Sequence, residues 1–256
     1  MNVLFTICGR AGSKGFKNKN LKEMNGVPIV YYSLAVIQEY VEKHKEDNVI
    51  VAVNTDSELL AELVKKYDPL DCEYIERKAE LAGDAVAKVD VIRDTYLSLN
   101  NNSIDMVIDL DITSPMRRLE DIENIIVEYA KGDYDLVFSV VEARRSPYFN
   151  MVEEKKDGYY KKICSSNYTA RQQAPKSYEL NASIYAYNPR FIEKKIEDTI
   201  LNHKCGISIM PDYLVLDIDS EEDFKMMQFL HEYYCEKDIE LEKIYNIARR
   251  NAGIKE

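Results

Sequence analysis

The chain has no run of apolar residues long enough to cross a bilayer, which takes about 20 residues in a helix. Its first residues, 1–7, lead into a charged loop and not into a cleavable hydrophobic segment. These absences argue against a membrane protein and a secreted precursor. We therefore expect a cytoplasmic protein that does not bind membranes.

Paired cysteines are also missing. The five cysteines are scattered, odd in number and without Cys-x-x-Cys spacing: Cys8, Cys72, Cys164, Cys205 and Cys235. This pattern indicates neither a disulfide framework nor a zinc site. With a formal net charge of −11, the chain also lacks the overall basic field that draws proteins to nucleic acid. Any phosphate binding must therefore depend on positive charge concentrated locally.

The composition is that of an ordinary folded protein, with 46% hydrophobic and 31% charged residues in 256. Short β-branched runs alternate with segments of helical period, which predicts a doubly wound, mostly parallel α/β sheet in a single domain, residues 1–256. The expected strands are 3–8, 49–53, 73–75, 106–110 and 136–141, and the helices between them are 29–43, 58–67, 85–99 and 119–130.

The pattern breaks at residues 142–178, which are rich in Tyr, Lys, Arg and Ser and show no helical period. We interpret this segment as an inserted arm. Further strands are expected at 183–187, 206–210 and 214–218, followed by a helix capped by Ser220 and a last helix at 239–250. Ligands of such sheets gather at the carboxyl ends of the strands, so the loops there should line one cleft.

The loop after the first strand reads Gly9-Arg10-Ala11-Gly12-Ser13-Lys14-Gly15 and continues to Lys19-Asn20. Its three glycines allow backbone N–H groups to point inward as an anion nest, and its arginine and lysine side chains are long enough to contact an anion bound there. A triphosphate is therefore a natural ligand. The loop is neither a Walker A sequence nor the Gly-x-Gly-x-x-Gly dinucleotide fingerprint. The alternative is a flexible, solvated basic loop without a ligand.

This loop resembles the opening motif of the acylneuraminate cytidylyltransferases, Ala-Arg-x-x-Ser-Lys-Gly followed by Lys-Asn, with Gly9 in place of alanine. The family includes the enzymes for legionaminic and pseudaminic acids. The resemblance implies a nucleotide-diphospho-sugar transferase-like fold and a catalytic role for Lys19 and Arg10 at the CTP phosphates. It also implies a set of nucleotide-binding residues: Arg10, Ala11, Gly12, Ser13, Lys14, Lys19, Asn20, Arg77 and Asp84.

Three further blocks follow in the family's order. Residues 77–84 are similar to Arg-Pro-x-x-Leu-Ala-x-Asp, and residues 111–117 are similar to Gln-Pro-Thr-Ser-Pro-Leu-Arg, with Asp111 in place of glutamine. Residues 171–185 are similar to Arg-Gln-x-x-Pro ending in Asn-Gly-x-Ile-Tyr, with Ala182 in place of glycine. The resemblance implies these sugar-binding residues: Asp111, Thr113, Ser114, Arg171, Gln172, Gln173, Tyr178 and Asn181. For Tyr178 a dimer contact is the alternative, and for Asp84 a helix cap.

Asp217-Ile218-Asp219 looks like the family's terminal Asp-Ile-Asp-Thr-Glu-x-Asp motif. If these residues end a strand, alternation puts both carboxylates on one face, about 7 Å apart. Mg²⁺ prefers one or two carboxylates together with phosphate oxygens and water. We therefore expect Asp217 and Asp219 to bind Mg²⁺, and we give Asp217 a further catalytic role.

The resemblance implies transfer of CMP from CTP to the anomeric hydroxyl of a nonulosonic acid, with pyrophosphate released. It also implies a homodimer in which the arm of residues 142–178 reaches the partner's sugar site. Two alternatives remain open. One is the enzyme for the eight-carbon sugar acid Kdo, and the other is a non-catalytic nucleotide-binding relative.

Overall fold

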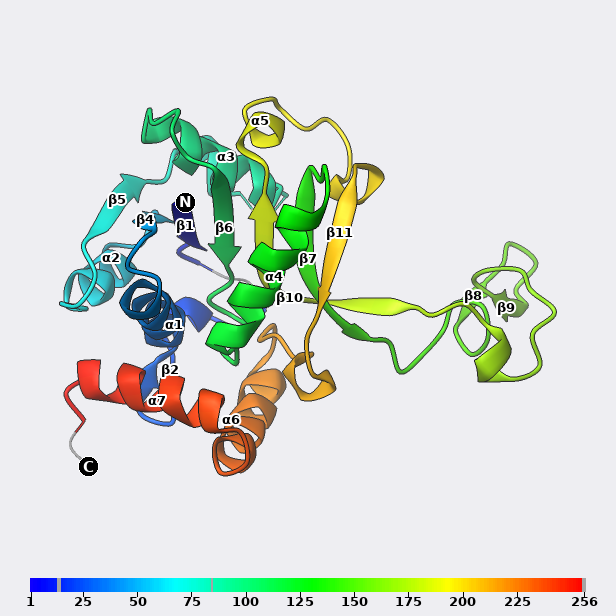
Figure 1. Ribbon diagram of the computed structural model, residues 1–256. Coiled ribbons are helices and arrows are strands. Elements are labelled where there is room, and N and C mark those ends of the chain that lie inside the picture. The colour runs from blue at the N-terminus through cyan, green and yellow to red at the C-terminus, as the bar shows by residue number, and fades with distance from the viewer. Residues whose placement is uncertain (13–14, 84, 255–256) are drawn as a thin grey trace.

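The computed structural model describes residues 1–12, 15–83 and 85–254. Its centre is a seven-stranded sheet with the order β11-β7-β10-β6-β1-β4-β5, flanked by helices on both faces (Figure 1). The strands are β1 (Asn2–Gly9), β4 (Asn48–Thr55), β5 (Cys72–Glu76), β6 (Met106–Leu110), β7 (Leu136–Glu142), β10 (Tyr178–Tyr187) and β11 (Cys205–Ile209). All neighbouring pairs are parallel except those of β10, which runs antiparallel to β6 and β7. The predicted mostly parallel α/β sheet is confirmed.

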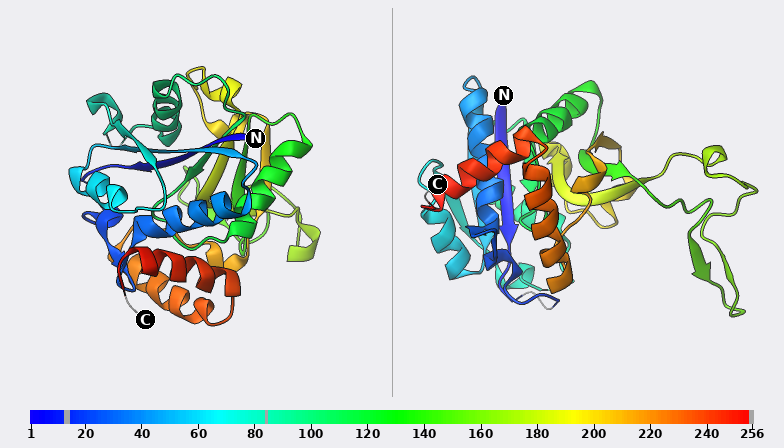
Figure 2. Two further views of the ribbon diagram at one scale, coloured as in Figure 1. Left: turned by 60° about the vertical axis from the view of Figure 1, so that its left-hand side comes forward. Right: turned by 90° about the horizontal axis from the view of Figure 1, so that it is seen from below.

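Alternation along the strands divides the core into two layers. In β1, Val3, Phe5 and Ile7 join one apolar cluster while Leu4 joins the other, because successive side chains point to opposite faces. The helices are α1 (Ile29–Lys43), α2 (Glu58–Lys65), α3 (Lys88–Ser98), α4 (Leu119–Lys131), α5 (Pro189–Ile192), α6 (Glu221–Cys235) and α7 (Ile239–Asn251). Helices α1, α2 and α4 cover the first face and α3 and α5 the second, while α6 and α7 extend the first layer beyond α1 (Figures 1 and 2).

The arm leaves the body between β7 and β10 and projects away from it (Figure 1). It carries a small ribbon, β8 (Val152–Glu154) and β9 (Tyr160–Lys162), and a short 3₁₀ helix, Arg171–Gln173. A second small ribbon, β2 (Glu23–Met24) with β3 (Val27–Pro28), precedes α1. Because the chain returns from the arm beside the strand by which it left, β10 is antiparallel to β7 and enters the sheet between β7 and β6.

Two local predictions were wrong. In place of the strand expected at 214–218, the structure has the end of a short 3₁₀ helix, Asp212–Leu214, followed by irregular chain. This chain crosses the end of the sheet, where Ile218 N donates to Thr113 O (2.9 Å), and does not run alongside a neighbouring strand. The helix expected from residue 85 begins at Lys88. By contrast, Ser220 caps α6 as expected, its side chain accepting from Asp223 N.

Candidate active site

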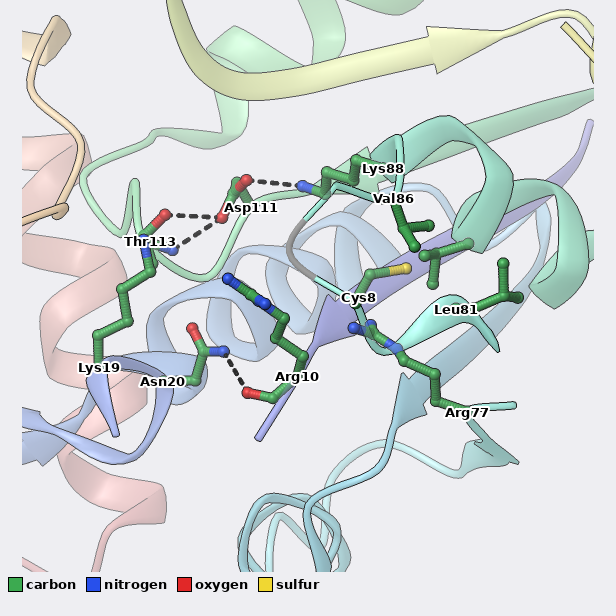
Figure 3. A pocket seen from close by; sticks show the side chains of 12 residues that line it. Cys8, Arg10, Lys19, Asn20, Arg77, Leu81, Val86, Lys88, Asp111 and Thr113 are labelled. Atoms are coloured by element: carbon green, nitrogen blue, oxygen red, sulfur yellow. Dashed lines mark hydrogen bonds and ion pairs between the residues drawn. The ribbon is translucent and has the colours of Figure 1, made fainter. Parts of the chain in front are cut away.

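A cavity of about 260 Å³ lies at the carboxyl ends of β1 and β6, where the sequence predicts a cleft (Figure 3). Six of the predicted site residues line it: Arg10, Lys19, Asn20, Arg77, Asp111 and Thr113. The rest of its wall is Cys8, Leu81, Gly83, Val86, Lys88 and Val91. Residues more than 100 positions apart in the sequence therefore meet at one edge of the sheet.

The basic loop turns sharply at this edge. Gly12 has φ +71°, a left-handed conformation that favours glycine, and a Cβ on Gly15 would lie 2.9 Å from Asp219 O. Asn20 Nδ2 donates to Arg10 O (3.2 Å), which ties the two ends of the loop together. Ala11 N donates to a carboxylate oxygen of Asp56 (2.7 Å), so this backbone N–H is already bonded to an anionic partner. The predicted Ser13 and Lys14 lie outside the described residues.

Lys19 connects this loop to the acidic segment at residues 217–219. Its Nζ donates to Ile218 O (2.9 Å) and to Asp219 Oδ1 (2.8 Å). The side chain of Asp219 is 74% exposed and that of Lys19 only 21% exposed. The ammonium group is therefore held at the cavity wall, with a carboxylate next to it.

Asp217 and Asp219 are not among the lining residues of the cavity but lie next to it, since Asp219 accepts from Lys19 and the charges of Lys19 and Asp111 act on Asp217. The strand that the sequence predicted here is absent, so regular alternation does not explain their placement. Burial raises the pKa of Asp217, and the negative charges of Asp219 and Asp111 raise it further. Carboxylates that repel one another in this way fit a divalent cation. Among the described residues no group of three or more His, Cys, Asp or Glu forms a metal site, so a cation here would need substrate oxygens or water as well.

Arg77 follows β5 and lines the opposite side of the cavity from Lys19 (Figure 3). Its guanidinium donates to Asn54 Oδ1 (2.9 Å) and to Asn54 O (3.0 Å), and burial lowers its pKa. These bonds fix the group at the end of β4. Asp84, the other nucleotide-binding prediction in this block, lies outside the described residues.

Asp111 is held from two sides. Its Oδ1 accepts from Thr113 N (3.0 Å) and Thr113 Oγ1 (2.9 Å), and its Oδ2 accepts from Lys88 Nζ (2.7 Å). Burial alone would raise the pKa of Asp111, but the Lys88 charge and these bonds outweigh it and lower the pKa to about 2. Asp111 is therefore a fixed carboxylate at neutral pH.

Lys88 was not predicted as a site residue. It begins α3, and its Nζ also lies 2.6 Å from Asp109 Oδ2. The sequence does contain a signal, because Asp109 interrupts the apolar run of β6 and is fully buried. A buried carboxylate needs a partner, and a cation close to it in the fold was to be expected.

Arg117, the last residue of the block that begins at Asp111, is fully buried, and burial lowers its pKa to about 10. It donates to Ser33 Oγ (2.7 Å) and Ser183 Oγ (3.1 Å), and to the carbonyls of Asp111 (2.5 Å), Ser114 (2.7 Å) and Ser183 (3.2 Å). It therefore clamps the loop after β6 onto α1 and β10.

Ser114 and Asn181 are also buried. Ser114 Oγ donates to Asn181 O (3.1 Å), and the Asn181 amide bonds Ser139 Oγ (2.6 Å) and Leu214 O (3.0 Å). Ala182 has φ +52° at the register shift of β10, which explains why the related motif carries glycine here. Neither Ser114 nor Asn181 lines the cavity, so their side chains support its wall.

The predicted sugar-binding residues of the arm lie elsewhere in the single chain. Arg171 and Gln172 line a separate cavity of about 290 Å³ at the base of the arm, and Arg171 donates to Ala143 O (2.8 Å). Gln173 Oε1 accepts from Thr169 N (3.0 Å), and Tyr178 begins β10. The structure of one chain therefore does not bring these residues to Lys19 or Arg77.

Residues 4–255 match the family model described as cytidylyltransferase. This chain belongs to the cytidylyltransferase family. It is thus a nucleotidyltransferase, as the motifs at Arg10, Lys19 and Asp217 led us to expect.

Two relatives from bacteria cover nearly all of this cytidylyltransferase. It is 37% identical over 231 residues to the post-translational flagellin modification protein B of Campylobacter coli. It is 35% identical over 232 residues to the CMP-N,N'-diacetyllegionaminic acid synthase of Campylobacter jejuni. Each match covers 89% of this chain and 94% of the relative.

Among solved structures, the fold is similar to that of a CMP:2-keto-3-deoxy-manno-octonic acid synthetase complexed with CTP. The TM-score is 0.64 at 15% identity, with 91% of this chain and 99% of the other covered. At this identity the likeness shows the fold alone. Among the described residues no helix is both long enough and apolar enough to span a membrane.

Proposed function

We propose that this cytidylyltransferase transfers CMP from CTP to the anomeric hydroxyl of a nonulosonic acid of the sialic or legionaminic type, and releases pyrophosphate. The observation that carries the proposal is the cavity in which Arg10, Lys19 and Arg77 converge beside Asp217 and Asp219. The similarity to a relative named for a legionaminic acid product supports the choice of sugar.

In this proposal the anomeric oxygen attacks the α-phosphorus of CTP, a new P–O bond forms, and the bond to the bridging oxygen of pyrophosphate breaks. Lys19 and Arg10 offset the negative charge that develops on the α-phosphoryl oxygens. Arg77 and the chain from Leu81 to Gly83 line the other end of the cavity, where we place the nucleoside.

Asp217 and Asp219 would hold Mg²⁺ together with phosphate oxygens and water, since their mutual repulsion favours a cation between them. When bound, Mg²⁺ offsets charge on the triphosphate. Asp217 is also our candidate to take the proton of the anomeric hydroxyl, because it lies close enough to Lys19 and Asp111 for their charges to act on its carboxyl group.

Pyrophosphate release tests the function directly. The purified protein would be given CTP and Mg²⁺ with N-acetylneuraminic, legionaminic or pseudaminic acid or Kdo, and with ATP, GTP or UTP in place of CTP. We expect turnover with CTP and a nonulosonic acid at roughly 1–10³ s⁻¹, the ordinary range for enzymes. Turnover with Kdo alone would replace our sugar assignment, and silence from folded protein that binds CTP would favour the non-catalytic relative.

We also propose a homodimer in which the arm, residues 142–178, completes the partner's sugar site. The proposal is supported by the distance of Arg171 and Gln172 from the main cavity within one chain and by the exposed Tyr159 and Tyr160 on the arm. Light scattering at micromolar concentration should give twice the mass of one chain. A monomer under conditions of full activity would contradict the proposal.

Mixing two inactive variants tests the exchange of arms. If Lys19→Ala and Arg171→Ala are each inactive, a heterodimer still contains one site with an intact Lys19 and the partner's intact Arg171. We therefore expect partial recovery of pyrophosphate release after the two variants are mixed and allowed to exchange. Each variant treated alone in the same way is the control. No recovery despite exchange would mean that Arg171 acts within its own chain.

A further inference from the structure

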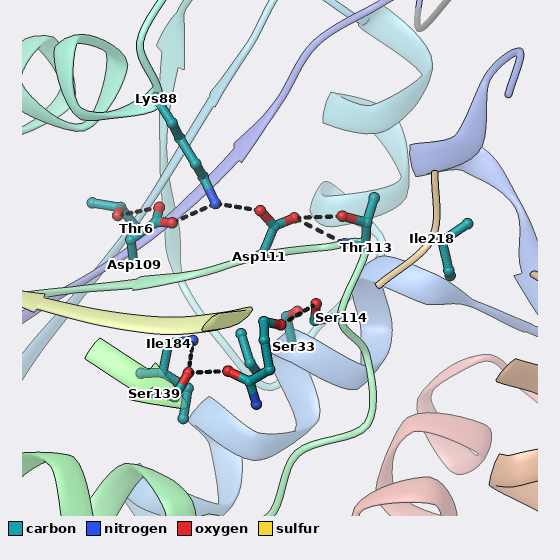
Figure 4. Close-up of polar contacts among 12 residues, drawn as sticks. Thr6, Ser33, Lys88, Asp109, Asp111, Thr113, Ser114, Ser139, Ile184 and Ile218 are labelled. Atoms are coloured by element: carbon teal, nitrogen blue, oxygen red, sulfur yellow. Dashed lines mark hydrogen bonds and ion pairs between the residues drawn. The ribbon is translucent and has the colours of Figure 1, made fainter. Parts of the chain in front are cut away.

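The wall of the cavity contains an ionic triad of Lys88, Asp109 and Asp111, in which Asp111 belongs to a family motif and Lys88 and Asp109 do not. Lys88 Nζ lies 2.6 Å from Asp109 Oδ2 and 2.7 Å from Asp111 Oδ2 (Figure 4). Asp109 is completely buried, while the side chains of Lys88 and Asp111 are 33% and 21% exposed. Because Lys88 and Asp111 both line the cavity, their exposed parts are available to a ligand there (Figure 3).

Each member of the triad comes from a different element, so the arrangement depends on the packed fold. Asp109 lies in β6 opposite Thr6 of β1, whose Oγ1 donates to Asp109 Oδ1 (2.8 Å). Lys88 begins α3, and Asp111 begins the loop after β6. Asp109 therefore anchors the ammonium group from inside the sheet, and the ammonium group in turn orients Asp111 at the surface of the cavity.

Counting donors and acceptors shows what the pair can still bind. An ammonium group has three N–H donors. Among the described residues Lys88 donates one of them to Asp111 Oδ2, and its ammonium group also forms an ion pair with Asp109 Oδ2 (2.6 Å). A carboxylate oxygen accepts about two hydrogen bonds. Both positions on Asp111 Oδ1 are used by Thr113, whereas within the described part of the chain Oδ2 accepts only from Lys88. At least one donor on Lys88 Nζ and one acceptor position on Asp111 Oδ2, two atoms that lie 2.7 Å apart, therefore remain side by side at the cavity wall.

A hydroxyl group matches this arrangement, because its single oxygen both donates and accepts. It can donate to Asp111 Oδ2 and accept from Lys88 Nζ at the same time. A secondary amide in its ordinary trans form fits less well, since its N–H and C=O point in opposite directions. We propose that Lys88 and Asp111 together bind one hydroxyl group of a sugar and so determine which sugars the enzyme accepts.

The protonation states agree with this role. The carboxylates of Asp109 and Asp111 overcome the effect of burial and raise the pKa of Lys88, so the ammonium group stays a donor. The pKa of Asp111, about 2, keeps it a hydrogen-bond acceptor but makes it a poor base. The pair therefore recognises the hydroxyl and does not remove its proton.

The inference rests on the proposed function, which supplies two sources for the hydroxyl: the acceptor sugar acid and the ribose of CTP. The experiment compares kcat/KM for the best acceptor from the pyrophosphate assay with a series of analogues that each lack one hydroxyl. A parallel arm uses 2'-deoxy-CTP and 3'-deoxy-CTP. Wild-type protein should lose about 100-fold or more in kcat/KM with one of these analogues, because a site built for a hydroxyl rejects a substrate without it.

The variants Asp111→Ala and Lys88→Met then show whether the pair causes that loss. Each should lower kcat/KM for the complete substrate and respond little to removal of the same hydroxyl. Asp111→Ala leaves the Lys88–Asp109 contact in place. The test can therefore still be made with this variant if Lys88→Met does not fold. Lys43→Met, which removes a lysine paired with Glu123 (2.6 Å) outside the cavity, is the matched control and should discriminate like wild type.

The inference is supported if one acceptor analogue is a poor substrate for wild-type protein but the variants hardly distinguish it from the complete acceptor. That result, which we call a coupled loss, assigns the hydroxyl to the sugar acid. A coupled loss with a deoxy-CTP supports the inference and assigns the hydroxyl to the ribose. If Asp111→Ala lowers kcat/KM equally for complete and deoxy substrates throughout the series, the pair is only structural and the inference is wrong. If wild-type protein turns over no acceptor, the proposed function itself fails, and that result is seen before any variant is compared.

Discussion

Replacing Lys19 by alanine is expected to lower kcat for pyrophosphate release about 10²- to 10³-fold, the usual loss when one preorganised stabiliser of developing charge is removed. In the structure the Lys19 ammonium group is held at the cavity wall by Ile218 O and Asp219 Oδ1. It is thus fixed where the α-phosphate is proposed to lie. Steady-state kinetics with saturating CTP and acceptor would measure the effect.

The control for this variant is Lys45→Ala. Lys45 is an exposed lysine in the turn between α1 and β4, at the amino ends of the strands, so its loss changes the net charge equally but leaves the cavity intact. Thermal unfolding should be nearly the same for both variants. Unchanged kcat in folded Lys19→Ala protein would remove Lys19 from the catalytic role that we assign to it.

Replacing Arg117 by leucine is expected to destabilise the protein by about 3–5 kcal/mol, because each buried polar group left without a partner costs about 1–3 kcal/mol. Arg117 is fully buried and its guanidinium bonds three carbonyls and two hydroxyls. The carbonyls of Asp111 and Ser114 lose the contacts that hold the loop after β6. Urea unfolding without ligands would give the change in the free energy of unfolding.

Arg190→Leu provides the comparison, since Arg190 is exposed at the first turn of α5 and only its backbone N–H has a capping role. Its unfolding free energy should stay within about 0.5 kcal/mol of wild type, as for most surface substitutions. If Arg117→Leu were equally harmless, the buried hydrogen bonds of Arg117 would have no net value for stability. Our explanation of why the motif ends in arginine would then be wrong.

Much of the fold could be predicted because each element carries its own pattern. The apolar period of α1 predicted residues 29–43, the bounds that the structure has, and the β-branched run at 106–110 predicted β6. The direction of β10 could not be predicted in this way. It depends on the arm, which returns the chain beside β7, and no local pattern records that path.

In the candidate site, too, residues in local motifs were predicted and contacts between distant residues were not. Arg10, Lys19, Arg77 and Asp111 were predicted from short motifs, and the structure brings them to one cavity. Lys88 was missed because its importance comes from two carboxylates more than 20 residues away in the chain. The strand expected at 214–218 was wrong because an apolar run indicates only that a segment is buried. Here the segment is buried because it crosses the end of the sheet, not because it is a strand within it.

The sequence by itself determined the class of fold, the family and the basic and acidic motifs, because period, glycine placement and motif spacing are local properties of the chain. Only the tertiary structure decided which charged groups meet. It separated Arg171 and Gln172 from the main cavity within one chain, and it joined Lys88 to Asp109 and Asp111. The physical reason is that hydrogen bonds and ion pairs act over a few ångströms in space, whatever the separation of the residues along the chain.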